Sequence, residues 1–286
     1  ELVWIFGCTI YLAMMAEGFL GYVLPYGQMS YWGAQVIISL FGAIPYVGES
    51  LELWVRGDYY ISGITVSRFF ALHVVALPLI LIALVFLHLV ALHEVGAGNP
   101  EGVDIEEHLD DDGVPLDSVP FFPYKVLNAL VAIGVFMTVF SIIMFFFPEG
   151  GGYFIEMANF QEANPLVTPD HIAPVWYYAP FYTMLRAIPD PLGGLIVMAA
   201  AVAIFFIVPW LDRSKVASIR YKGIYSKIAI TLFGVSFLTL GYLGTVGVTE
   251  IRKTMSIICT IIYFAYFLLM PIYTKYEKTK EVPERL

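Results

Sequence analysis

The stretch SRFFALHVVALPLILIALVFLHLVALHE, residues 67–94, decides the fold of this chain. Between Arg68 and Glu94 it contains no lysine, arginine, aspartate or glutamate, and it is long enough to cross a bilayer as an α-helix. Three of the five histidines in the chain, His73, His88 and His93, belong to it. Because an ionisable side chain inside a membrane is costly, these histidines predict a functional site.

His73 and His88 are separated by fifteen positions, which corresponds to about 22 Å along a helix and about 60° around it. One helix therefore presents two imidazoles on roughly one side, one near each membrane surface. Neutral imidazole is a common metal ligand and an axial ligand of haem. The alternative is a pair of histidines hydrogen-bonded to neighbouring helices. His93 lies about 140° around the helix from His88 and predicts a different site.

The composition is typical of a multi-pass membrane protein, since 59% of the 286 residues are hydrophobic and 14% are charged. We expect an all-α membrane helical bundle with six transmembrane helices. They are predicted at residues 1–24, 67–94, 126–147, 191–210, 227–247 and 255–273. Apolar stretches in residues 28–65 are too short to span and predict interfacial helices. The net charge of −9 comes largely from one loop and argues against a nucleic-acid partner.

Two glycines in the first segment, Gly7 and Gly21, are fourteen residues apart and lie within about 40° of the same helix face. Glycine costs about 1 kcal/mol relative to alanine inside a helix, so it is used where another group approaches the backbone. Helix packing is one explanation. The spacing nearly matches that of the two histidines, which favours two flat macrocycles stacked across the membrane. Glu17 is a further ionisable side chain at membrane depth.

Arg68 and the remaining basic residues indicate how the chain is oriented. Arg68 precedes His73 near the membrane edge, where it either pairs with an anion such as a haem propionate or anchors the helix. Ten of the fifteen lysine and arginine residues fall on the side that contains the C-terminus. That excess predicts a cytoplasmic C-terminus. We refer to the C-terminal side as the n side and to the opposite side as the p side.

Several motifs closely resemble cytochrome b, the membrane subunit of the ubiquinol–cytochrome c reductase complex, in its bacterial form. They are GYVLPYGQMSYWGA, RFFALH followed by LHLVALHEVGAGNP, PVWY, and PWLDRSKVASIRYKG. The resemblance covers most of the chain and implies helices C to H of an eight-helix fold, without helices A and B. It implies helices C and D in residues 1–94, an acidic n-side connector at 95–123, and a C-terminal domain at 124–286. The quinol-oxidation loop would be residues 149–190.

The resemblance implies two haems b as cofactors. His73 would be an axial ligand of the low-potential haem near the p side, and His88 of the high-potential haem near the n side. Gly7 and Gly21 match glycines that contact haem in the family. His93 matches a residue of the quinone-reduction site. The family takes its second axial ligands from helix B, so they are expected outside this chain.

The resemblance also implies a quinol-oxidation site. Its residues would be the loop motif and two tyrosines around the pocket: Pro174, Val175, Trp176 and Tyr177, with Tyr22 and Tyr182. The family often has a glutamate where Val175 stands, and valine cannot accept a proton. Glu17, on the helix that leads to this pocket, is the expected replacement. The family also often has an aspartate where Ala129 stands, which weakens the match at the quinone-reduction site.

The implied function is the haem-bearing subunit of a respiratory quinol–cytochrome c oxidoreductase. One electron of ubiquinol would pass to a Rieske iron–sulfur protein and a c-type cytochrome, and the other through two haems to an n-side quinone, with proton translocation. The bilayer would be a bacterial inner membrane, and the complex a homodimer. A photosynthetic cytochrome b is disfavoured because its chain is split after helix D. The alternative from another class is a proton-coupled secondary transporter without haem.

Overall fold

The computed structural model describes residues 1–152 and 155–286, and within them the secondary structure is helical, with no β-strand. Six helices are long and apolar enough to cross a membrane, as the sequence predicts. They are α1 (Leu2–Val23), α4 to α5 (Gly63–Val95), α6 with its preceding turn (Phe121–Phe146), α8 to α9 (Pro191–Leu211), α10 (Ile224–Gly244) and α11 (Glu250–Leu268). The prediction of a six-helix all-α membrane bundle is therefore confirmed.

Two of these helices begin earlier than the hydropathy pattern predicts, because polar caps set their first turns. The side chain of Thr249 accepts a hydrogen bond from the backbone N–H of Arg252 at 3.3 Å, so α11 begins at Glu250 and not at 255. Ser62 and Thr65 form a capping box, so α4 begins at Gly63. Hydropathy alone locates the apolar core of a span and misses a polar first turn.

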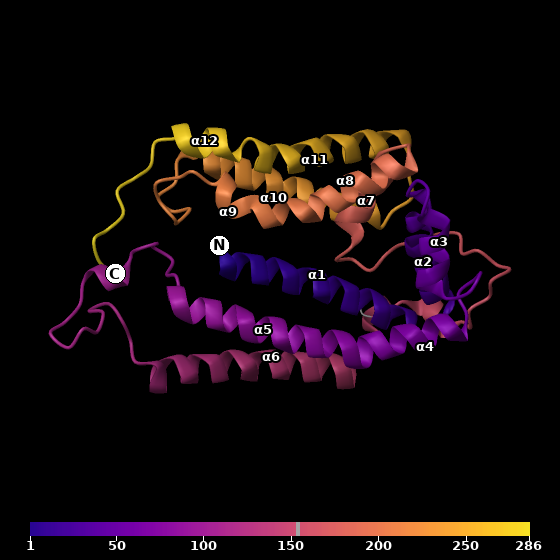
Figure 1. The fold of residues 1–286 in the computed structure, drawn as a ribbon, viewed down its shortest axis with the longest axis horizontal. Helices are drawn as coiled ribbons and strands as arrows, with labels where there is room; N and C mark the ends of the chain where they lie inside the picture. The colour runs from indigo at the N-terminus through magenta and orange to yellow at the C-terminus, as the bar shows by residue number, and fades with distance from the viewer. Residues whose placement is uncertain (153–154) are drawn as a thin grey trace.

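The expected interfacial segment folds as short helices at one end of the bundle, the p end. These are α2 (Gln28–Ser39), a 3₁₀ turn (Leu40–Ala43) and α3 (Gly48–Arg56). Figure 1 shows α2 and α3 running across the direction of the long helices. A fourth short helix, α7 (Ala179–Ala187), lies at the same end and packs on α10.

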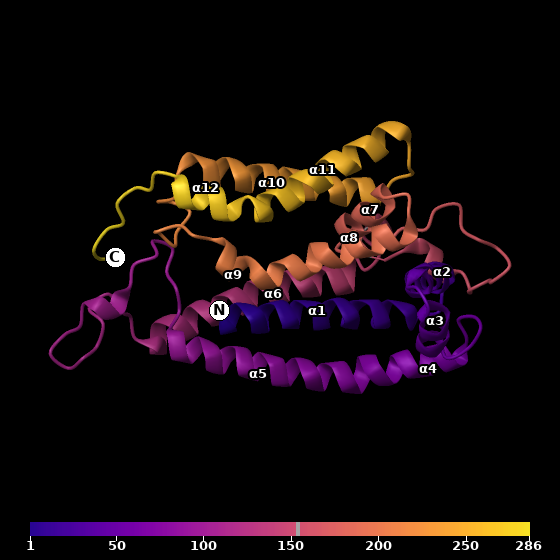
Figure 2. The same ribbon diagram turned by 45° about the horizontal axis from the view of Figure 1, so that its top comes forward.

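The helices pack in two groups, each with its own buried core. One core joins α7, α8, α10 and α11 around Tyr263, whose phenol donates a hydrogen bond to the Ala201 carbonyl at 2.7 Å. The other joins α1, α2 and α4 around Val23, Ile38 and Phe69. Figure 2 shows α10 and α11 on one side of the bundle and α1 and α5 on the other. Sites between the groups therefore take residues from both halves of the chain.

The opposite end, the n end, carries both termini and the acidic connector (Figure 1). Glu101 of this connector pairs with Arg220 and accepts a hydrogen bond from the Tyr221 hydroxyl. Asp117 accepts two hydrogen bonds from the guanidinium of Arg285, at 3.0 and 3.2 Å. These contacts hold the connector against the loop before α10 and the C-terminal tail.

Candidate functional site

A single π-turn interrupts the helix that carries the three histidines. It spans Leu72–Ala76, and the backbone N–H of Leu77 reaches the carbonyl of Leu72, five residues back. Pro78 follows at once and has no N–H of its own. A π-turn contains about one residue more than an α-turn. The fifteen-residue spacing of the histidines therefore acts as an α-helical spacing of fourteen, which is the spacing of the two glycines on α1.

His73 lies against α1 near the p end. Its Nδ1 is 3.0 Å from the backbone carbonyl oxygen of Glu17 and 3.0 Å from Oε1 of the Glu17 carboxylate. Gly21 lies beside the imidazole, and a Cβ at this position would overlap the ring of His73. The glycine is therefore required for α1 and the histidine ring to approach this closely.

His88 lies against α1 near the n end, opposite the second glycine. A Cβ at Gly7 would be 3.5 Å from Cε1 of His88, an ordinary contact distance. Nδ1 of His88 is buried and has no hydrogen-bond partner among the described residues. A cavity of about 1120 Å³ opens beside it, large enough for a cofactor or ligand. Its walls come from α1, α5, α9 and the loop before α10, and include Tyr11, Phe205, Pro209, Asp212, Ser214 and Lys215.

A second cavity, of about 480 Å³, lies near the p end between the two helix groups. Its lining is almost wholly apolar, with two phenols among the side chains. It includes Leu12, Met15, Ala16, Phe19, Ile37, Pro174, Tyr178, Tyr182, Met198 and Val202. A smaller cavity of about 20 Å³ shares Pro174 and Tyr178 and also touches Tyr22 and Val175. Four of the residues predicted for quinol oxidation therefore line one region: Pro174, Val175, Tyr22 and Tyr182.

The other two residues of the PVWY motif lie differently. Trp176 is 77% exposed, and neither it nor Tyr177 lines these cavities. The sequence reasoning missed Tyr178, which lines both cavities and donates a hydrogen bond to the Met15 carbonyl of α1. Burial raises the pKa of the Tyr178 phenol, so it stays protonated and remains a donor at neutral pH.

Gly18 is a second residue that the sequence reasoning missed. A Cβ at Gly18 would lie 2.9 Å from the Tyr177 hydroxyl and 3.3 Å from that of Tyr178. Both phenols can approach α1 only because this position has no side chain. In the sequence, Gly18 is recognisable only as a glycine three residues before Gly21. Its role becomes clear only from the packing of the loop on α1.

Glu17, Arg68 and His93 are among the predicted site residues that lie outside both large cavities. Glu17 points toward His73, while its neighbours Met15 and Ala16 line the p-side cavity. Arg68 donates a hydrogen bond to the Trp54 carbonyl at 2.8 Å, which ties α4 to α3. The Nδ1 of His93 is 2.7 Å from the Leu89 carbonyl one turn earlier, and its side chain is exposed. None of the three lines the n-side or the p-side cavity.

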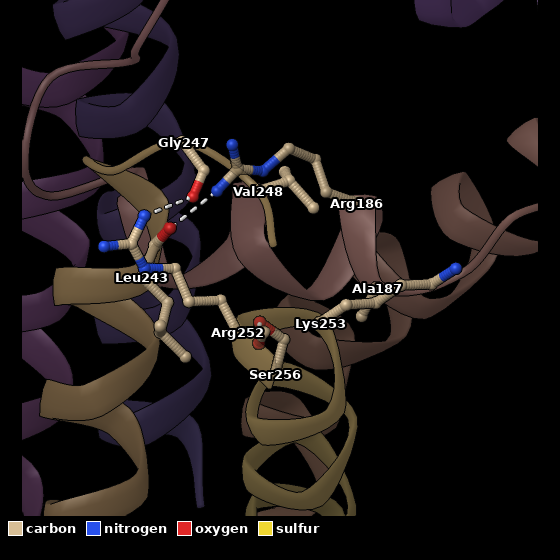
Figure 3. Close-up of a pocket in the computed structure, with 8 residues that line it drawn as sticks. All are labelled: Arg186, Ala187, Leu243, Gly247, Val248, Arg252, Lys253 and Ser256. Carbon is tan, nitrogen blue, oxygen red and sulfur yellow. Dashed lines mark hydrogen bonds between the residues drawn. The ribbon is translucent and has the colours of Figure 1, made fainter. Parts of the chain in front are cut away.

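A small cationic pocket of about 10 Å³ lies apart from these sites, at the p ends of α10 and α11 (Figure 3). Arg186 donates to the Leu243 carbonyl at 2.6 Å, and Arg252 to the Gly247 carbonyl at 2.8 Å. The two guanidiniums therefore satisfy carbonyls at and just beyond the C-terminus of α10, where positive charge is favourable. The pocket is too small for a quinone.

Comparison with known proteins decides the family of this chain. The family described as cytochrome b (N-terminal)/b6/petB matches residues 1–180, and the one described as cytochrome b (C-terminal)/b6/petD matches residues 162–264. This chain belongs to the cytochrome b family. It is 54% identical to cytochrome b of Allochromatium vinosum, covering 100% of this chain and 71% of that protein. It is 46% identical to cytochrome b of Rickettsia bellii, covering 100% of this chain and 69% of that protein.

A solved structure titled "Hyperthermophilic respiratory Complex III" superimposes with a TM-score of 0.87 at 34% identity. The match covers 97% of this chain and 71% of that one. The predicted resemblance to cytochrome b is thus confirmed over nearly the whole chain. Membership in this family implies haem b.

The residues of this cytochrome b fit such a group in part. Two imidazoles lie at two depths, each beside a glycine of α1, and the buried Nδ1 of His88 has no partner among the described residues. No cluster of three or more metal-ligating side chains occurs in residues 1–152 and 155–286. The candidate haem-contacting groups in the described residues are therefore the two separate imidazoles of His73 and His88.

Proposed function

We propose that this cytochrome b is the haem-bearing membrane subunit of a respiratory quinol–cytochrome c reductase. It would oxidise quinol at the p side by a bifurcated reaction, deliver electrons to an n-side quinone and contribute to proton translocation. The observation that carries the proposal is the pairing of His73 with Gly21 and of His88 with Gly7 at two depths of one helix pair. Membership in the family and the likeness to a complex III structure support the same function.

In this proposal His73 and His88 are the axial ligands of two haems b, low-potential at the p side and high-potential at the n side. Bound there, the haems supply one-electron redox chemistry. The chain contributes position and environment. Gly21 lets the His73 ring lie directly against the α1 backbone, and Gly7 keeps the α1 backbone open beside His88.

Quinol oxidation is assigned to the p-side cavity of about 480 Å³. Its apolar walls suit a quinone ring and tail, and the Tyr178 and Tyr182 phenols supply polar groups for orientation. Val175 lines the adjoining cavity and cannot take a proton. The proton acceptor is proposed to be Glu17, which lies one position from the pocket-lining Ala16, on the face of α1 toward His73.

Quinone reduction is assigned to the n-side cavity, and His93, near the same end of α5 but outside the cavity lining, is proposed as a further residue of that site. The cavity of about 1120 Å³ already contains polar groups, namely Asp212, Ser214 and Lys215. Ala129 offers neither a proton nor a hydrogen bond, so these side chains are the polar groups proposed for the site. Protons would enter here and leave at the opposite side.

The partners in this proposal are a Rieske iron–sulfur protein and a c-type cytochrome, in a homodimeric complex of a bacterial inner membrane. The exposed Trp176 beside the p-side cavity supports docking at loop 149–190, and the p-side Arg68 is proposed to hold a haem propionate. The C-terminus would be cytoplasmic. The division into residues 1–94, 95–123 and 124–286 stays a prediction.

Reduced-minus-oxidised spectra of the intact complex test the proposal. We expect two b-type α-bands that titrate separately. When quinol is the only electron donor, both bands should be absent until quinol is added. The transporter alternative predicts a protein without visible absorbance. A complete absence of b-type absorbance would contradict the proposed function.

A further inference from the structure

We propose that Glu17 is a positioning residue for His73, and that its carboxylate lowers the reduction potential of the p-side haem. The inference rests on the proposed function, because it requires His73 to be an axial ligand. It concerns Nδ1 of the His73 imidazole, the ring nitrogen that would not bind iron. It adds a second role to a side chain that the sequence suggests only as a proton acceptor.

The geometry that carries the inference is the contact between the two side chains. Oε1 of Glu17 lies 3.0 Å from Nδ1 of His73, and the same nitrogen is 3.0 Å from the Glu17 backbone carbonyl. The Glu17 side chain is only 18% exposed, and its Oε2 is buried without a hydrogen-bond partner in the described chain. No lysine or arginine of the described residues forms an ion pair with it. Nδ1 of His73 is thus the contact found for the Glu17 carboxylate among the described residues.

Two hydrogen-bond acceptors lie beside Nδ1 of His73, and they determine which ring nitrogen carries the proton. Both are oxygens, so Nδ1 of His73 carries the proton and Nε2 is left with its lone pair for a metal. A carboxylate that accepts the Nδ1 proton makes the imidazole a more basic ligand, as in the carboxylate–histidine pairs of other metal sites. A more electron-rich ligand and a nearby negative charge both favour the oxidised iron. Glu17 therefore lowers the potential of the haem that His73 would hold.

The n-side histidine lacks this arrangement. Nδ1 of His88 is buried and has no hydrogen-bond partner in the described residues, so no carboxylate or carbonyl among them accepts a proton from it. The two axial nitrogens supplied by one helix are therefore unequal. The difference favours electron flow from the p-side site to the n-side site, the direction that the proposed function requires.

The contact of Glu17 with His73 lies on a different face of α1 from the side chains that line the p-side cavity. Met15, Ala16 and Phe19 face the p-side cavity, whereas Glu17 and Gly21, four residues apart, share the face toward His73. A carboxylate on this face contacts the ligand directly.

Potentiometric titration of the two b-type α-bands in the intact reductase tests the inference. Glu17→Gln keeps a hydrogen-bond acceptor and removes the charge, so the midpoint potential of the p-side haem should rise while that of the n-side haem stays constant. Glu17→Asp keeps the charge and should give a potential nearer to the wild type. Glu94→Gln removes one carboxylate at the exposed n end of α5, the helix that carries His88, and should leave the p-side potential unchanged.

An unchanged p-side potential in Glu17→Gln, with both haems bound, would overturn the inference. So would an equal shift in Glu94→Gln, because it would indicate a general effect of charge. If Glu17→Gln loses its haem, the Glu17→Asp potential decides the question: a value far above the wild type with haem retained contradicts the role of the carboxylate. A wild-type complex without b-type absorbance would contradict the proposed function, and the inference that rests on it would fail with it.

Discussion

The p-side and n-side halves of the α1–α5 pair use the same elements and produce different sites. Each half places a histidine of α5, or of the turn before it, beside a glycine of α1. At the p side the His73 ring is pressed against Gly21, and its Nδ1 has two oxygen acceptors. At the n side the His88 ring is at ordinary contact distance from Gly7, its Nδ1 has no partner in the described residues, and a large cavity adjoins it.

The comparison teaches that a repeated spacing does not make two equivalent sites. The spacing sets depth and direction, which are properties of one helix. The basicity of each imidazole and the space beside it depend on neighbouring residues, and those residues belong to other helices. The carboxylate of Glu17 beside His73 and the cavity beside His88 give the two histidines different chemical environments.

The largest expected effect comes from removing either imidazole. His88→Ala should lose the n-side haem and keep the p-side haem, and His73→Ala should do the reverse, because an axial bond to iron cannot be replaced by a methyl group. The haem content and α-band positions of each purified complex check this. Retention of both haems in either variant would remove that histidine from its role.

The two glycines should respond unequally to the same methyl group. In Gly21→Ala the new Cβ overlaps the His73 ring, so we expect a loss of about 1–3 kcal/mol of stability and release of the p-side haem. In Gly7→Ala the Cβ meets His88 at 3.5 Å, and the change should stay within about 1 kcal/mol. Thermal melting and haem content distinguish them. Equal losses would show that the halves are not packed differently.

A substitution at Tyr178 should affect only the p-side site. Tyr178→Phe removes the donor to the Met15 carbonyl, which should cost about 0.5–1.5 kcal/mol of local stability and slow quinol oxidation by up to about tenfold. Both haem potentials should stay constant. Tyr242→Phe, at an exposed position of α10, is a matched control. A rate unchanged in Tyr178→Phe would mean that this hydrogen bond does not position the loop.

The smallest effect is expected at the n-side tail, far from either histidine. The Arg285 guanidinium beside Asp117 lowers the pKa of that carboxyl below its usual value near 3.8. The contact is therefore complete at neutral pH and is lost only as pH falls through the lowered pKa. Asp117→Asn should make the C-terminal tail easier to cleave at pH 7 without changing haem content. Tail cleavage equal to the wild type would show that this ion pair does not hold the tail.

Much of the fold was predictable from sequence because each span is set by its own composition. Length and hydropathy located six helices, and the short apolar segments between 28 and 65 were predicted as non-spanning helices. The near-equal histidine and glycine spacings also predicted an imidazole and a small residue at each of two membrane depths. These are local or periodic properties, and a helix converts them into geometry without help from the rest of the chain.

The remaining features depend on contacts between distant segments. The π-turn at Leu72–Ala76 leaves no periodic signal, yet it brings the histidines into register with α1. Gly18 and Tyr178 gain meaning only because the loop packs on α1. Trp176 belongs to the loop motif by sequence but lies 77% exposed, outside the cavity.

Hydrophobicity and helical period act within a single segment, so a helical membrane protein with two imidazoles at two depths of one span can be predicted from the order of residues alone. The neighbour of each imidazole depends on how the helices pack together. A carboxylate lies beside His73 and an open cavity beside His88, since these are supplied by α1 and by the distant α8–α9 segment. The chemistry of a site depends on the space between helices, and no single helix encodes that space.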